Sequence, residues 1–159
     1  MSEIRRKLIE WLSKIEISGS VIDVGGISWP MRFQVVDKGI TDYKILDKRE
    51  ERKGINTDYV YDINKKFPHI GFYDNAFCTE VMQFIYDPFT VLNNIRYILK
   101  DNGKLFITFH LTHPPMKDSD YLRYTEKGIR KLLKETGFEI EELIEPIKGY
   151  YLVKAICQN

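Results

Sequence analysis

The stretch that decides the fold is Val21-Ile22-Asp23-Val24-Gly25-Gly26, a short apolar run that ends in two glycines. The run predicts a buried strand, and the glycine pair predicts a tight turn directly after it. Glycine there lets the backbone approach a ligand, because no Cβ stands in the way. A second predicted strand, residues 43–47, ends at Asp47, which lies 22 positions after Gly25 (47 − 25). An acidic residue about 20 positions beyond such a turn is placed to accept hydrogen bonds from ribose hydroxyls.

Helices and strands alternate along the rest of the chain. Apolar residues at helical spacing predict an opening helix over residues 2–16, and a weaker helix is expected over residues 29–36. The other predicted elements are strands at residues 59–61, 73–79, 104–110, 138–144 and 150–156, and helices at residues 88–99 and 125–135. This alternation predicts an α/β fold: a compact, Rossmann-like, doubly wound sheet of seven mostly parallel strands flanked by helices. The last strand is expected to be antiparallel, and no cap domain is expected.

Length and composition favour a single domain over residues 1–159, with an N-terminal helix over residues 1–17 and a core over residues 18–159. No apolar run approaches the roughly 20 residues that span a bilayer, and the first residues lack the apolar segment of a signal peptide. We therefore expect a cytoplasmic protein with no membrane partner. The formal net charge of +1 argues against a dedicated nucleic-acid binder.

Cysteine and histidine spacing gives little support to a metal or disulfide framework. Cys78 and Cys157 lie far apart in apolar surroundings, outside any Cys-x-x-Cys pair, so we expect two reduced core residues. His110 and His113 are spaced as His-x-x-His, and a metal site with Cys78 or Asp118 is the weakest alternative for them. We expect no metal.

A third acidic residue, Asp62, follows the third predicted strand and joins Asp47 at the sheet edge where α/β proteins bind ligands. These stretches together resemble the motif series of class I S-adenosylmethionine-dependent methyltransferases, closest to the UbiE-like or "methyltransferase domain 11" branch. The resemblance runs from about Val21 to the C-terminus. Its most specific element is Leu99-Lys100-Asp101-Asn102-Gly103-Lys104-Leu105, the step from helix to fifth strand. The quoted stretches are residues 21–26, 45–47, 61–63, 73–81 and 98–105.

The resemblance implies S-adenosyl-L-methionine as cofactor and S-adenosylhomocysteine as its product. It also assigns one part of the cofactor to each motif. The implied contacts are Asp23, Gly25 and Gly26 at the methionine end, Asp47 at the ribose, Asp62 with the amide of Ile63 at the adenine, and Thr79 with Glu80 at the floor. Lys48 is a further expected cofactor-binding residue.

The first loop departs from the family pattern. Where the family typically has two further glycines, this chain has Ile27 and Trp29. Either the loop takes a different path or the affinity for the cofactor is reduced. The same departure argues against a nicotinamide-binding Rossmann domain, which needs glycine at the third position for close packing of helix and strand.

Residues 110–125, between the fifth strand and the last helix, gather polar and aromatic side chains where α/β enzymes place substrate groups. His113, His110 and Asp120 are the candidate general bases. Alternatively, Asp120 and Arg123 form a structural pair that fixes the loop. Methyl transfer from a sulfonium also needs little beyond alignment of the nucleophile, which makes a base optional. The expected acceptor-binding residues are Phe84, Tyr86, Arg123 and Tyr124.

Three functions remain open. The leading one is a methyltransferase acting on a small molecule, a glycan or a protein. The second is a catalytically silent domain used for binding or regulation, which Ile27 and Trp29 support. The third is nucleic-acid methylation, for which Arg5, Arg6 and Lys7 are the one basic cluster. With no cap domain, the acceptor pocket is expected to be open, which suits a large acceptor or a homodimer that completes its wall.

Overall fold

The computed structural model describes residues 1–66, 68, 70–115 and 120–158. Seven strands form one sheet in the order β5-β2-β1-β6-β7-β9-β8. All neighbouring strands are parallel except β9, which is antiparallel to both β7 and β8. The predicted doubly wound sheet with an antiparallel last strand is confirmed. The strands are β1 Glu16–Val24, β2 Val36–Asp47, β5 Tyr59–Val60, β6 Tyr73–Cys78, β7 Leu99–His110, β8 Phe138–Ile147 and β9 Tyr150–Cys157.

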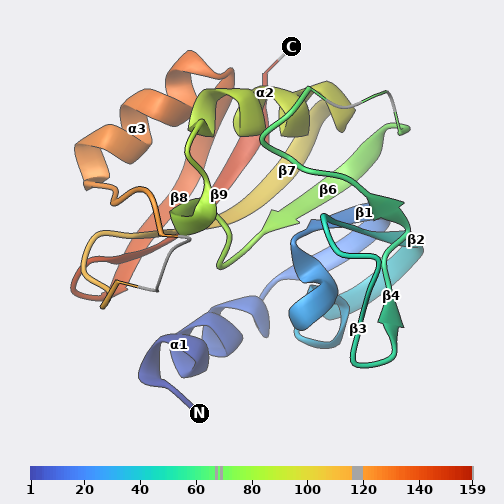
Figure 1. Cartoon of the computed structure of the whole chain (residues 1–159), viewed down its shortest axis with the longest axis horizontal. Coiled ribbons are helices and arrows are strands. Elements are labelled where there is room, and N and C mark those ends of the chain that lie inside the picture. Colours follow the sequence, from blue (N-terminus) through green and yellow to red (C-terminus); the bar gives the residue numbers. More distant parts are fainter. Residues whose placement is uncertain (67, 69, 116–119, 159) are drawn as a thin grey trace.

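Helices cover both faces of this sheet (Figure 1). Helices α2 (Pro88–Ile98) and α3 (Glu126–Glu135) pack against the larger core, and α1 (Glu3–Leu12) packs against the smaller one. Successive strand residues point to opposite faces. In β6, for example, Phe77 belongs to the core under α1, whereas Ala76 and Cys78 belong to the core under α2 and α3.

Capping side chains define the helix ends. The Thr125 hydroxyl accepts a hydrogen bond from the Gly128 amide (3.1 Å), so the predicted start of α3 is confirmed. Helix α1 is shorter than expected. It ends at Leu12 instead of residue 16, because Glu16 already begins β1.

The connection from β1 to β2 contains no α-helix. The helix expected over residues 29–36 is wrong: the chain forms two single 3-10 turns, Gly26–Ser28 and Met31–Phe33. Pro30 lies between them, and a proline disfavours helical backbone in the residue before it. Residues 48–57 form a hairpin of β3 (Glu51–Arg52) and β4 (Ile55–Asn56). Within residues 1–66, α1 is therefore the single α-helix.

Both cysteines are buried and free, as expected from the sequence. Burial raises the pKa of the Cys78 thiol, with a further contribution from the charge of Asp23, so this thiol is an unreactive core group. In the part of the chain that the structure describes, no helix is both long and apolar enough to cross a bilayer.

Candidate cofactor and acceptor site

A cavity of about 530 Å³ opens at the carboxyl ends of the parallel strands. Its size lies within the range of small-molecule sites. The strand order β5-β2-β1-β6 extends it along the sheet edge over about three strand spacings, or roughly 14 Å. Ten of the residues predicted from the sequence line it: Gly25, Gly26, Asp47, Lys48, Asp62, Ile63, Thr79, Glu80, Phe84 and Tyr86.

The glycine pair is required by close contacts beneath the cavity. Gly25 adopts a left-handed conformation (φ 76°), and a Cβ there would lie 2.5 Å from Cγ2 of Val81. Its amide donates to the Leu46 carbonyl at 2.7 Å. A Cβ on Gly26 would collide with the Asp23 carboxylate. Neither position therefore tolerates a side chain without movement of its neighbours.

Asp23 does not line the cavity, although the resemblance placed it at the methionine end of the cofactor. Its side chain is buried, and one carboxylate oxygen accepts hydrogen bonds from the Met31 amide (2.8 Å) and the Tyr43 hydroxyl. Burial raises the pKa of this carboxyl to about 6, against the opposing effect of the two hydrogen bonds. Asp23 thus braces the β1–β2 loop from below.

Asp47 lines the cavity, and its carboxylate forms an ion pair with Arg49. Nε and Nη2 of Arg49 each lie 2.9 Å from a different carboxylate oxygen of Asp47, which is a bidentate pair. Arg49 and Arg52 also donate to the Ser28 hydroxyl, at 3.2 and 2.7 Å, and so link the hairpin to the glycine loop. A ribose bound at Asp47 would share this carboxylate with Arg49, since Oδ2 accepts only one of the Arg49 hydrogen bonds.

An unsatisfied acceptor marks the β5 end of the cavity. Oδ1 of Asp62 accepts hydrogen bonds from the amide (3.0 Å) and the side-chain nitrogen (3.2 Å) of Asn64. The side-chain oxygen of Asn64 is buried and has no partner among the described residues. Such an atom is costly unless a ligand or water donates to it. This oxygen is enclosed, whereas Asp62 and Ile63 line the cavity itself, where the Asp62 carboxylate could accept from the exocyclic amine of an adenine.

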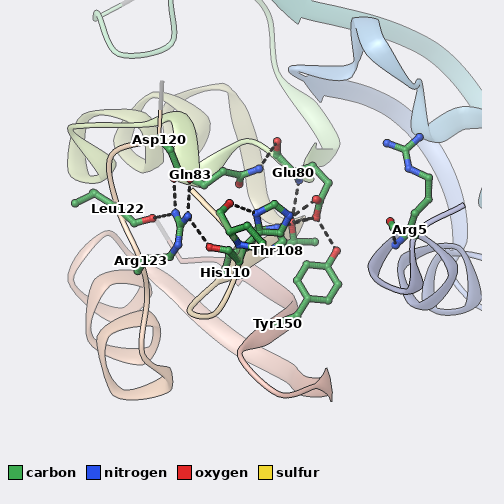
Figure 2. Close-up of polar contacts among 12 residues, drawn as sticks. Arg5, Glu80, Gln83, Thr108, His110, Asp120, Leu122, Arg123 and Tyr150 are labelled. Atoms are coloured by element: carbon green, nitrogen blue, oxygen red, sulfur yellow. Dashed lines mark hydrogen bonds and ion pairs between the residues drawn. The ribbon is translucent and has the colours of Figure 1, made fainter. Parts of the chain in front are cut away.

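Glu80 forms the other end of the cavity (Figure 2). Its backbone is left-handed (φ 58°), and its amide donates to the Thr108 hydroxyl at 2.8 Å. Its carboxylate accepts from the Tyr150 hydroxyl (2.7 Å) and lies 3.2 Å from Nε2 of His110. Burial alone would raise the pKa of Glu80, but the interactions with His110, Tyr150 and Thr108 outweigh it and lower that pKa.

The two candidate histidines differ in exposure. His110 is 1% exposed and lies behind Glu80, outside both cavities, so it is placed to orient Glu80 and not to reach an acceptor. His113 lines a smaller cavity of about 110 Å³ together with Glu80. Nδ1 of His113 lies 2.8 Å from the Pro114 carbonyl, an acceptor only, so Nδ1 carries the hydrogen and Nε2 is the nitrogen able to take up a proton.

Three other predicted site residues lie away from the cavities. The Asp120 carboxylate forms a bidentate pair with Arg123, which also donates to the His113 carbonyl at 3.1 Å. This geometry matches the structural-pair alternative. Tyr124 is buried, and its hydroxyl donates to the Met82 carbonyl at 3.1 Å.

Several cavity residues were missed from the sequence. Arg5 reaches the cavity from α1 and stacks on Trp29, with Cζ 4.4 Å from the ring centroid. Tyr121 lines the cavity beside Tyr86, their ring centroids 5.9 Å apart. The one sequence feature that could have indicated Tyr121 as a cavity residue is the concentration of aromatic residues in segment 110–125. The other missed lining residues include Arg49, Arg52, Tyr61 and Asn64.

A metal site finds no geometric support in the described residues. Within residues 1–66, 68, 70–115 and 120–158, no three His, Cys, Asp or Glu side chains are grouped so as to hold an ion. Asp118, one of the ligands weighed from the sequence, lies outside the described residues.

Comparison with solved protein structures identifies the class of fold. No family model and no curated protein matches the chain. Among solved structures, a Burkholderia thailandensis 1,6-didemethyltoxoflavin N1-methyltransferase, solved with 1,6-didemethyltoxoflavin and S-adenosylhomocysteine, is similar at a TM-score of 0.71 and 15% identity, over 99% of this chain and 79% of that one. An S-adenosylmethionine-dependent methyltransferase from Mesorhizobium loti gives a TM-score of 0.72 at 16% identity over 98% of each chain. The fold is therefore that of class I S-adenosylmethionine-dependent methyltransferases.

Proposed function

We propose that this chain is an S-adenosylmethionine-dependent methyltransferase of the UbiE-like, or methyltransferase domain 11, branch. The observation that carries the proposal is one cavity that joins the glycine turn, Asp47 and Asp62. These groups suit a close backbone approach, a ribose and an adenine amine respectively. Two similar structures, the toxoflavin enzyme and the calicheamicin methyltransferase CalO1, hold S-adenosylhomocysteine, which favours the same ligand here.

The cofactor supplies a methyl group on a positively charged sulfur. Asp47 and Lys48 would bind its ribose, and Asp62, Ile63 and Asn64 its adenine. The aromatic side chains of Phe84, Tyr86 and Tyr121 line the same cavity and offer a surface for an acceptor. Tyr86 and Tyr121 are more than half exposed, at 58% and 56%, so an acceptor could bury substantial aromatic surface there.

Positioning would supply most of the rate, and His113 is the proposed base where the acceptor must lose a proton. Of the three candidate bases, His113 alone lines one of the two cavities. The acceptor belongs to the small-molecule, glycan or protein classes. We further propose one cytoplasmic domain, and a homodimer that covers the open acceptor side.

A silent binding domain is the second candidate, and the Asp47–Arg49 pair is the observation that favours it. A ligand that needs the Asp47 oxygens competes with two charge-assisted hydrogen bonds. If Arg49 wins that competition, the fold would bind a different ligand or none. Nucleic-acid methylation has less support, because the net charge is only +1.

Calorimetric titration with S-adenosylmethionine and S-adenosylhomocysteine tests the proposal directly. We expect dissociation constants in the micromolar range for both. No binding at millimolar ligand would exclude the methyltransferase and leave the silent domain. Transfer of tritium from labelled cofactor to pooled small molecules, glycans or proteins would then identify the acceptor class. Salt-sensitive labelling of DNA or RNA would instead favour the third function.

A further inference from the structure

Arg5 carries a positive charge into the site without an acidic partner. Its side chain is partly buried, and its guanidinium lies over the Trp29 ring. Among the described residues, no carboxylate lies within 4.0 Å of that guanidinium, whereas its neighbour Arg6 pairs with Glu3 at 3.8 Å on the exposed side of α1. A partly buried arginine held by an aromatic ring and lacking a counter-ion is suited to bind an anion.

Glu80 presents the opposite charge to the same space. Among the residues that the structure describes, Arg5 and Glu80 are the two charged ones that line both cavities. In Figure 2, Arg5 stands apart from Glu80, and no bond is drawn between them. His110, Tyr150 and Thr108 hold the Glu80 carboxylate on its far side, and Trp29 holds Arg5. The two charges are therefore fixed apart instead of neutralising each other.

This charge pair lies at the end of the cavity opposite the adenine and ribose residues. Asp62 and Asp47 follow β5 and β2, whereas Trp29 and Glu80 follow β1 and β6. In the strand order, β6 is two spacings from β2, or roughly 10 Å. A ligand whose adenosine occupies Asp47 and Asp62 would bring its remaining atoms over Gly25 to this pair.

We propose that Arg5 and Glu80 form a binding site for a zwitterionic α-amino acid group, with the carboxylate of the cofactor's methionine moiety on Arg5 and its ammonium group toward Glu80. The inference rests on the proposed function and extends it to residues outside the glycine loop. It also gives Trp29 a role. A tryptophan in place of a loop glycine gives up a close backbone approach, but it supports the arginine that binds the same end of the ligand.

Three ligands separate the parts of this site: S-adenosylhomocysteine, its decarboxylated analogue, and 5′-methylthioadenosine, which lacks the whole amino acid group. We expect Arg5→Gln to weaken S-adenosylhomocysteine binding by about 10- to 100-fold, the range of a lost charge-assisted hydrogen bond. The same variant should bind the decarboxylated analogue and 5′-methylthioadenosine as wild type does, within about twofold. Unchanged binding of 5′-methylthioadenosine also shows that the variant is folded.

Arg6→Gln is the matched control, because it removes a neighbouring arginine whose side chain is 56% exposed. We expect it to bind all three ligands as wild type does. Equal loss of all three ligands by Arg5→Gln would overturn the inference, since Arg5 would then only shape the cavity. If Arg5→Gln binds all three ligands as tightly as wild type does, the inference is also overturned. Arg5 would then be available to bind an anionic acceptor. If wild type binds none of the three, the proposed function fails and this inference with it.

Discussion

Replacing Asp23 with asparagine tests whether this carboxylate is a buried brace or a ligand contact. Its oxygen accepts hydrogen bonds from the Met31 amide and the Tyr43 hydroxyl, and none of the described residues places a cation against it. Burial is the main reason that its pKa lies at about 6 instead of 3.8. An asparagine oxygen can accept the same two hydrogen bonds without a charge.

The expected effect follows from the change in pKa. Because the folded-state pKa is raised, the native protein binds a proton more tightly than the unfolded chain, and stability falls as pH rises between about 4 and 6. The difference of about 2 pKa units corresponds to about 3 kcal/mol. Asp23→Asn should therefore raise the free energy of unfolding by about 3 kcal/mol at pH 7, and this gain should vanish near pH 4.

Urea and thermal unfolding of both proteins between pH 4 and pH 8 measure this difference. At this chain length, 3 kcal/mol corresponds to about 6–12 °C in melting temperature. Asp42→Asn is the control, since the Asp42 carboxylate is 50% exposed and its loss should cost under about 0.5 kcal/mol. A variant less stable than wild type at pH 7, with a deficit that shrinks toward pH 4, would refute the reasoning. Affinity for S-adenosylhomocysteine should stay within about threefold.

Three further predictions concern the cavity and its covering loop. Asp47→Ala should weaken S-adenosylhomocysteine binding by about 1.5–3 kcal/mol in calorimetry, because the ribose loses a charged acceptor. Arg49→Ala should tighten binding of the same ligand by up to about fivefold, since it removes the competing ion pair; weaker binding would show that Arg49 helps the ligand. Asp120→Ala and Arg123→Ala should each lower the melting temperature by about 3–8 °C, and the double variant should lose less than their sum. Additive losses would mean that the two side chains act independently.

Much of the fold could be predicted because its signals are local. The Val21–Val24 run, the glycine pair and the acid at Asp47 are each fixed by neighbours along the chain, and alternating strands and helices predict a mostly parallel sheet. The helix expected over residues 29–36 failed because Pro30 disfavours helical backbone at Trp29. Asp23, on the preceding strand, instead accepts a hydrogen bond from the Met31 amide and fixes the path of this loop.

The site was predicted less completely, because its chemistry depends on partners far apart in the sequence. Arg5 meets Trp29 from another element, and Glu80 is held by Tyr150, 70 positions away. Asn64 stands out only once its oxygen is seen to be buried and unpaired. A motif comparison identifies which sheet edge binds the ligand, but it carries no information about these contacts.

The three acidic residues Asp23, Asp47 and Glu80 show how partners determine role at a shared sheet edge. Each follows or ends a parallel strand, so spacing alone treats them alike. Asp23 is enclosed by neutral donors, so its charge is costly and its pKa rises. Asp47 has a guanidinium with which a ligand would share the carboxylate. Glu80 is bonded by His110, Tyr150 and Thr108 on one side, which lowers its pKa, and its side chain keeps 30% exposure toward the cavity. Only the latter two line the cavity and can meet a bound ligand, whereas Asp23 is buried beneath it and binds the Met31 amide of the loop.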